Sequence, residues 1–243
     1  MSASTRACEI EREYVLKAYD EIAEGYLHWR SKPWIKIVNL AKKFLANCKI
    51  VLDAGCGNGR HSEFLLKWKI TVVGVDISQK MLETYKRKVG YNSRIHLIQC
   101  SILKLPFRSN VFDGIISVLV IHNIPLEERR IKALKELKRV LKRKGITLIS
   151  VWNISHPKLF LKAVIHKILR NGEFGDVFLK WRRKGKIVYR FYHLYTPKKF
   201  IKNVTVTGFK ILLVDKIITS RRIFKYSNTV VVCTKNNSAE NMF

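Results

Sequence analysis

The residues best suited to chemistry in this chain lie in one short stretch near residue 55. An apolar run, Ile50 to Leu52, predicts a buried strand, and the acidic Asp53 follows it. Three glycines then come at alternate positions: Gly55, Gly57 and Gly59. Glycine adopts the backbone angles that a tight turn needs, and it lets a ligand lie directly against the main chain. Because residues 61–68 have a helical pattern, the stretch predicts a strand, a glycine turn and a helix N-terminus, which together form a nucleotide-binding edge.

The spacing of these glycines narrows the choice of ligand. A dinucleotide-binding turn has the pattern G-x-G-x-x-G, which would require glycine in place of Arg60, and a phosphate-binding loop would require G-K-[ST]. The pattern D-x-G-x-G-x-G instead resembles the first motif of the class I S-adenosylmethionine-dependent methyltransferases. Their cofactor carries a sulfonium and an ammonium group but no phosphate, so an acidic residue beside the turn suits it. An unrelated glycine-rich turn is the alternative at this point.

A second acidic residue strengthens the cofactor prediction. The next strand, Thr71 to Asp76, ends in an acid 23 residues after Asp53. This is the distance at which a carboxylate meets a ribose diol in this type of unit. Asp76 is therefore the predicted ribose ligand. Its alternative role is to cap the helix that starts at Ser78, although Ser78 is itself a good N-cap.

The order of the elements predicts an α/β fold. We expect the Rossmann-like seven-stranded sheet of class I methyltransferases, with the last strand antiparallel, an N-terminal helical cover and an insertion after strand five. The parts of this single predicted domain are residues 1–47 (helices), 48–152 (cofactor-binding core), 153–195 (basic and aromatic insertion), 196–235 (helix and strands) and 236–243 (tail).

Five local predictions follow from proline, glycine and polar residues and from hydrophobic alternation. Pro33 stands at the first position of a helix that runs to Ala46. Gly145 closes a helix over 126–143, and Thr196 caps a helix that reaches about residue 205. Residues 172–185 form a loop, and 187–195 alternate well enough to be a strand.

Uncharged stretches and cysteines indicate the cellular compartment of the protein. The longest uncharged stretches, 114–126 and 145–157, are 13 residues each and are too short to span a bilayer. The five cysteines, at 8, 48, 56, 100 and 233, show no C-x-x-C pairing. They predict reduced, buried thiols in a cytoplasmic protein, with no disulfide frame and no metal site.

The charge predicts a polyanionic partner. The chain holds 47 Lys and Arg against 18 Asp and Glu, for a net charge of +29, and residues 121–243 contribute +21 of it. Such an excess repels itself in the folded state, and nucleic acid is the usual partner that offsets the repulsion. A thermophile-like, lysine-rich surface is the alternative, but such surfaces are normally rich in Glu as well, and Glu is sparse here.

Two further features extend the predicted site. His122 lies in the segment Ile121–Asn123 at the end of a strand over 112–120, and ligand crevices of open α/β sheets lie outside the carboxyl ends of their strands. We therefore expect His122 to face the transferred methyl group; a structural histidine in a loop is the alternative. Downstream, Trp181–Lys186 and Arg190–Tyr195 mix aromatic rings with cations, a mixture typical of nucleic-acid binding.

Together these segments resemble a subgroup of the class I enzymes, the methyltransferases that esterify the carboxymethyl group on the wobble uridine of tRNA. The resemblance runs over about residues 12–235. Its motifs are Tyr19–Ala23, Arg30–Trp34, Leu105–Arg108, Phe112–Asp113, Ser117–His122, Glu127–Arg130, Val151–Trp152, Gly175–Phe178 and Tyr192–Tyr195. It implies an S-adenosylmethionine-dependent tRNA methyltransferase that works with a small zinc-binding activator protein.

The resemblance also implies roles for individual residues. Arg30 and His122 are the predicted catalytic pair at the substrate carboxylate. The predicted substrate-binding residues are Trp34, Trp152, Lys184, Arg190, Tyr192 and His193, the last two near the wobble base. The predicted cofactor-binding residues are Asp53, Gly55, Cys56, Gly57, Gly59, Asp76, Ile77, Ser101, Ile102 and Val118.

This chain departs from the family pattern at two positions. Asn123 replaces a second histidine, and Ser101 replaces an acid that contacts the adenine amino group, which leaves that contact to the backbone. Alternative functions are another RNA methyltransferase, a small-molecule methyltransferase of the same fold, or an RNA-binding module without catalysis.

Overall fold

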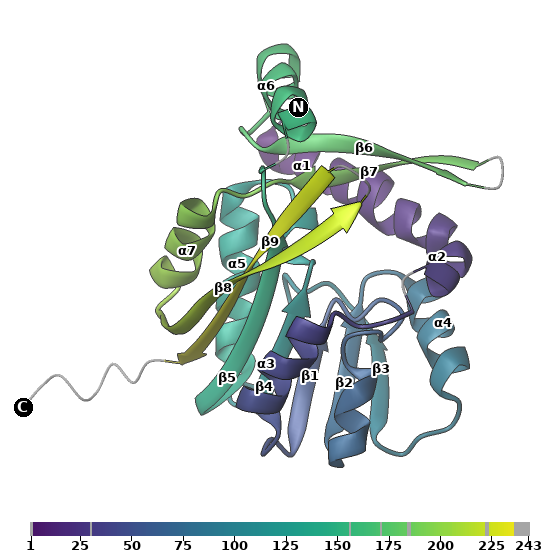
Figure 1. The fold of residues 1–243 in the computed structure, drawn as a ribbon, viewed down its shortest axis with the longest axis vertical. Coiled ribbons are helices and arrows are strands. Elements are labelled where there is room, and N and C mark those ends of the chain that lie inside the picture. The colour runs from purple at the N-terminus through teal and green to yellow at the C-terminus, as the bar shows by residue number, and fades with distance from the viewer. Residues whose placement is uncertain are drawn as a thin grey trace, which may run out of the picture.

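A computed structural model of the chain describes residues 2–29, 31–155, 157–170, 172–183, 186–221 and 224–235. Its main sheet has seven strands in the order β3-β2-β1-β4-β5-β9-β8 (Figure 1). They are β1 (Ile50–Ala54), β2 (Thr71–Asp76), β3 (Ile95–Gln99), β4 (Phe112–Val118), β5 (Leu141–Trp152), β8 (Phe209–Arg221) and β9 (Phe224–Lys235). β1 to β5 pair in parallel, and β9 lies antiparallel between β5 and β8. The predicted seven-stranded sheet with an antiparallel last strand is confirmed.

The apolar strands are covered on both faces by helices. Successive side chains of a strand point to opposite faces, so Val51 packs with α3 (Ile35–Leu45) while Leu52 packs with α5 (Glu127–Val140) and α7 (Pro197–Val206). Central strands of this kind are near-continuously apolar because neither face meets water. Two further elements follow β1 and β2: the short helix η2 (Glu63–Trp68) and α4 (Gln79–Val89).

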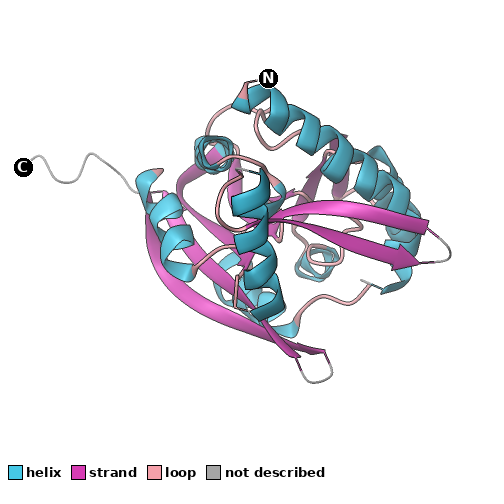
Figure 2. Cartoon of the chain, turned by 90° about the horizontal axis from the view of Figure 1, so that it is seen from above, coloured by secondary structure: helices cyan, strands magenta, loops and turns pink. Residues whose placement is uncertain are grey.

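A second layer lies over the carboxyl edge of the sheet. The hairpin of β6 (Asp176–Arg183) and β7 (Lys186–His193) forms its own two-stranded sheet above that edge, as the two views show (Figures 1 and 2). The N-terminal run consists of α1 (Ala3–Glu11), the π-helical η1 (Arg12–Leu16) and α2 (Lys17–Trp29). Ala18 and Ile22 of α2 pack with Val188 of β7 and Met81 of α4. The helix α6 (Pro157–Arg170) precedes the hairpin.

Three local predictions need correction. Residues 176–183, predicted as part of a loop, are strand β6, because their pairing partner β7 lies further along the chain and supplies the hydrogen bonds. The helix predicted over 126–143 ends at Val140, and Gly145 lies inside β5 rather than at a helix end. The basic residues at the end of the predicted helix suit the exposed face of a helix and the exposed end of a strand equally well. Pro33 precedes the N-cap Trp34, so it stands outside the helix.

The caps predicted from hydroxyl residues are confirmed. The Thr196 side chain accepts a hydrogen bond from the backbone N–H of Lys199 at the start of α7, and Ser78 accepts one from Met81 at the start of α4. Among the helices of the described ranges, none has the length and apolar character of a membrane span.

Candidate active site

A cavity of about 590 Å³ opens at the carboxyl edge of the sheet, between the strand ends and the hairpin. Its wall brings together most of the predicted site residues. These are Trp34, Asp53, Gly55, Cys56, Gly57, Asp76, Ile77, Ser101, Ile102, Val118, His122, Trp152, Arg190 and Tyr192. The parallel strands explain the convergence of the residues that follow them, because their carboxyl ends all meet at this one edge; Arg190 and Tyr192 reach it from the hairpin.

Two predicted residues that the structure describes, Gly59 and His193, are not part of that wall, and two more cannot be placed. Arg30 and Lys184 lie outside the described residues. Gly59 has a φ of +72°, and a Cβ built on it would come within 2.1 Å of the Tyr85 ring, so this glycine lets the turn pack against α4. His193 is buried on the side of β7 opposite Tyr192, because neighbouring residues of a strand point to opposite faces.

The glycine turn presents bare main chain to the cavity. The amides of Gly55 and Cys56 donate to the carbonyl of Val75 at 2.8 and 2.9 Å, and the Gly57 amide donates to Oδ2 of Asp76 at 2.8 Å. Gly57 has a φ of +52°, and a Cβ built there would meet no atom within 4 Å. A ligand can therefore lie directly against the backbone at Gly57, as the sequence predicted.

Asp53 is a buried acid with one unused oxygen. It is 2% exposed, and its Oδ2 has no hydrogen-bond partner among the described residues. Burial raises its pKa to about 7, the Ser62 hydrogen bond opposes the rise, and the charge of Asp76 adds to it. A cation bound at Oδ2 would favour the ionised form, so the position fits an ammonium group.

Asp76 is held by backbone donors. Its Oδ1 accepts from the Ser78 amide at 2.9 Å, and its Oδ2 accepts from the Gly57 amide. Burial raises the pKa of the carboxyl, and these N–H groups partly offset the rise because they stabilise the carboxylate. Each oxygen retains a lone pair that a ligand hydroxyl could use.

His122 sits in the short helix η3 (Ile121–Asn123) after β4 and is 1% exposed. Its Nδ1 accepts a hydrogen bond from the Trp152 amide at 3.4 Å, and its ring stacks on Tyr192 with centroids 5.6 Å apart. Burial, with the charges of His193 and Arg190, lowers its pKa to about 3. The imidazole is therefore neutral near pH 7, and because Nδ1 accepts, Nε2 carries the proton and can donate.

Asn123, one of the two departures from the family pattern, supports the loop that carries His122. Leu119 adopts a left-handed φ of 62°, an unfavourable conformation for a leucine. The Asn123 side-chain amide donates to the Leu119 carbonyl at 3.0 Å. The other departure, Ser101, accepts from the Leu103 amide at 3.3 Å, so its hydroxyl stabilises the loop while the residue lines the cavity.

The cavity wall also contains residues that sequence reasoning did not assign to the site. They include Tyr19, Asn58, Arg60, Lys162, Lys180 and Asn228. Arg60 could have been found, because it directly follows the glycine motif, and Tyr19 lies in a segment that resembles the family. Asn228 gave no signal, since only the pairing of β9 with β5 brings it to the site.

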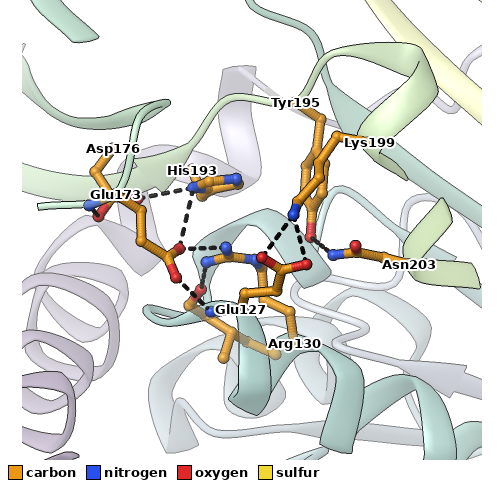
Figure 3. A network of polar contacts seen from close by, with 9 residues as sticks. Glu127, Arg130, Glu173, Asp176, His193, Tyr195, Lys199 and Asn203 are labelled. Atoms are coloured by element: carbon orange, nitrogen blue, oxygen red, sulfur yellow. Dashed lines mark hydrogen bonds and ion pairs between the residues drawn. The ribbon is translucent and has the colours of Figure 1, made fainter. Parts of the chain in front are cut away.

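A polar network beside the cavity fixes the hairpin to the core (Figure 3). His193 Nδ1 lies 2.8 Å from Oδ1 of Asp176, and Glu173 forms an ion pair with the fully buried Arg130. Arg130 also donates to the Ile124 carbonyl at 3.0 Å, next to the loop that carries His122. His193 thus acts within this network rather than in the cavity wall.

The same network has one feature of a metal centre. Ligand atoms of Glu173, Asp176 and His193 lie within 4.8 Å of one another in the described part of the chain. However, the Arg130 guanidinium contacts Glu173 and supplies the positive charge that balances the carboxylates. The arrangement is therefore an ion-pair network that joins three segments.

Comparisons with known folds define the class of protein. Residues 52–149 match the methyltransferase domain family. A crystal structure of a SAM-dependent methyltransferase from Methanosarcina mazei superposes with a TM-score of 0.71, is 20% identical, and covers 84% of this chain and 98% of its own. The sheet order, the glycine turn and the acidic strand ends thus belong to a class I methyltransferase fold.

Sequence relatives identify the family within that class. A candidate methyltransferase of Encephalitozoon cuniculi is 33% identical over 83% of this chain and 90% of its own length. The tRNA (carboxymethyluridine(34)-5-O)-methyltransferase alkbh8 of Xenopus tropicalis is 38% identical over 60% of this chain, and that of Saccharomyces cerevisiae is 31% identical over 72%. The chain belongs to this methyltransferase family. It spans 22% of the Xenopus relative and 59% of the yeast one.

Proposed function

We propose that this chain binds S-adenosylmethionine in the cavity and transfers its methyl group to the carboxylate of a carboxymethyl group on the wobble uridine of tRNA. Relatives that are named tRNA (carboxymethyluridine(34)-5-O)-methyltransferases support the choice of substrate. The observation that carries the proposal is the separation of charge across one cavity. We call Asp53 and Asp76, at the ends of β1 and β2, its floor, and we call Arg190 of the hairpin with the neutral donor His122, whose ring stacks on Tyr192 of the same hairpin, its roof.

The residues of the floor fit the cofactor. The unpartnered Oδ2 of Asp53 would accept from the ammonium group, Asp76 would accept from the ribose hydroxyls, and the open face of Gly57 would receive the ligand against the backbone. Cys56, Ile77, Ser101, Ile102 and Val118 also line the cavity and complete the proposed cofactor site. The cofactor supplies an electrophilic methyl group.

The residues of the roof fit an anionic acceptor. A carboxylate is already ionised at neutral pH, so it needs no general base. It needs groups that hold one oxygen about 3 Å from the methyl carbon and in line with the bond that breaks. His122 can donate one hydrogen bond from Nε2, and Trp34, Trp152 and Tyr192 provide aromatic surface for a base. Arg30 remains part of the proposal as a second donor.

RNA binding is proposed from the distribution of charge. Residues 153–243 hold 19 basic and 4 acidic side chains, and Lys162 and Lys180 line the cavity from α6 and β6. Cations beside the cavity can hold the phosphates of the anticodon stem-loop. A small zinc-binding activator protein remains a proposed partner. The cytoplasm remains the proposed compartment, which the five free cysteines fit.

Nucleoside mass spectrometry tests the proposal. The purified chain is incubated with isotopically labelled S-adenosylmethionine and tRNA that contains carboxymethyluridine, with and without a zinc-binding partner protein. We expect the carboxymethyl nucleoside to be converted to its methyl ester, and we expect Asp53→Asn to slow the conversion when the cofactor is limiting. A label on another nucleoside would show that a different base is the substrate. A label on small carboxylic acids but not on RNA would refute the proposal.

A further inference from the structure

Arg190 of β7 is a cation in the cavity wall, and it has no ion-pair partner among the residues that the structure describes. Its Cζ lies 5.3 Å from the ring centre of Tyr192 and 6.0 Å from that of Tyr19. Its Nε is buried and makes no hydrogen bond within the described residues. Among the ion pairs of the described residues, none includes Arg190, whereas the acid Glu11 in the same wall is paired with Arg129.

An unpaired guanidinium in this position is costly. Arginine stays charged at any pH that a protein tolerates, and removing a charge from water costs several kcal/mol unless a counter-ion and hydrogen bonds replace the water. The neighbouring rings of Tyr19 and Tyr192 return part of that cost through cation–π attraction. They do not satisfy the Nε–H, which needs an acceptor atom.

The surroundings of Arg190 indicate which acceptor it takes. The guanidinium lies near two tyrosine rings and makes a hydrogen bond with Tyr19, while its buried Nε–H stays without an acceptor among the described residues. A planar guanidinium with a free N–H can donate to a carboxylate oxygen. Tyr192 also stacks on His122, and Arg190 and His122 both line the same cavity. The two donors can therefore contact one ligand group. RNA phosphates are better matched by the exposed cations outside, such as Arg182 on the same hairpin.

We propose that Arg190 is the counter-ion of the substrate carboxylate and the residue that distinguishes a carboxymethyl group from its neutral carbamoylmethyl analogue. This inference rests on the proposed function and identifies the group that recognises the negative charge of the substrate. Methylation removes that charge, so the ester product loses the same contact and should leave the cavity more readily than the substrate binds.

A binding experiment tests this role without turnover. Three anticodon stem-loop RNAs are compared that differ only at the wobble uridine, which carries a carboxymethyl, a carbamoylmethyl or a methoxycarbonylmethyl group. Dissociation constants are measured by fluorescence anisotropy with the full chain and saturating S-adenosylhomocysteine. For the wild type we expect the carboxymethyl RNA to bind about tenfold more tightly than the two neutral RNAs, the difference between a charged and a neutral hydrogen-bonded contact.

The variants separate Arg190 from general charge. Arg190→Met should bring the three affinities within about twofold of one another while S-adenosylhomocysteine still binds, and Arg190→Lys should restore part of the preference. Arg182→Met removes the same charge from an exposed position of the hairpin. It should weaken all three RNAs equally and leave the tenfold preference.

The outcomes distinguish this inference from the function on which it rests. If the wild type forms the ester but Arg190→Met keeps the full preference, the assignment of Arg190 is wrong and the proposed function stands. If the wild type neither forms the ester nor prefers the carboxylate, both are wrong. If Arg190→Met does not fold, a measurement on the wild type still tests the inference. The NMR signal of the Arg190 Nε–H should move downfield when the carboxymethyl RNA binds but not when either neutral RNA binds. An unchanged signal would contradict the inference.

Discussion

The titration of Asp53 gives a prediction with a defined pH window. Its pKa is raised to about 7 because the carboxyl is buried, with further repulsion from Asp76. Only the ionised form attracts the ammonium group of the cofactor. Binding of S-adenosylhomocysteine, which keeps that ammonium group, should therefore weaken as the pH falls through 7, whereas an ordinary aspartate would remain ionised down to about pH 4.

The magnitude follows from the ionised fraction of Asp53. With a pKa of about 7, half of the carboxyl is ionised at pH 7 and roughly one part in a hundred at pH 5, so affinity should fall about 50-fold between these two pH values. Asp53→Asn removes the charge at every pH. It should lower affinity at pH 7.5 by roughly ten- to hundredfold, the value of a charge-assisted hydrogen bond, and flatten the profile between pH 5 and 7.

Titration calorimetry with S-adenosylhomocysteine at half-unit steps from pH 5 to 8 measures both effects. Ser62→Ala removes the hydrogen bond that lowers the pKa of Asp53, so it should move the profile to higher pH. Asp113→Asn is the matched control. That carboxylate accepts from the Lys49 and Ile50 amides at the amino end of β1, away from the cavity, so the profile should not move. Equal slopes for the wild type and Asp53→Asn would refute the reasoning.

The same titration affects the stability of the ligand-free chain. Between about pH 4 and 7 the folded state keeps a proton on Asp53 that the unfolded state releases, so this group makes the free energy of unfolding fall as the pH rises through that window. With a folded-state pKa of about 7 against a model value of 3.8, the loss amounts to at most about 4 kcal/mol. Asp53→Asn should lack this loss in urea titrations at pH 5 and 8; parallel changes in both proteins would contradict the assignment.

Three further predictions concern the turn, the network and the charge. Gly59→Ala should destabilise the chain by about 1–3 kcal/mol more than Gly90→Ala, because both glycines have positive φ but only the first would drive a Cβ into the Tyr85 ring; equal losses in urea titrations would contradict this. Arg130→Met should cost about 1–3 kcal/mol because it leaves the half-buried Glu173 and the Ile124 carbonyl without their donor, and Glu173→Gln should restore part of the loss in the double variant. Affinity for RNA should fall steeply and linearly on a log–log plot against salt concentration, and a flat plot would argue against phosphate contacts.

The sequence determined the proposed cofactor half of the site. Asp53, the glycine turn and Asp76 lie within one strand–turn–helix–strand segment, so their spacing along the chain already fixes their relative positions. The Ser78 cap is equally local, and the structure has it as predicted. Apolar runs such as that of β1 likewise indicated central strands, because a parallel sheet with both faces covered leaves no polar side.

Only the tertiary structure decided the proposed substrate half. Arg190 and Tyr192 meet His122 because the hairpin folds back over the carboxyl edge of the sheet, and no local pattern specifies that contact. The alternation along β7 then separates neighbours in sequence: Tyr192 faces the cavity, while His193 joins Asp176 on the opposite side. Spacing along the chain fixes geometry only within a few residues of a turn. The direction of a side chain in a distant hairpin depends instead on strand register and on the surface against which the hairpin packs.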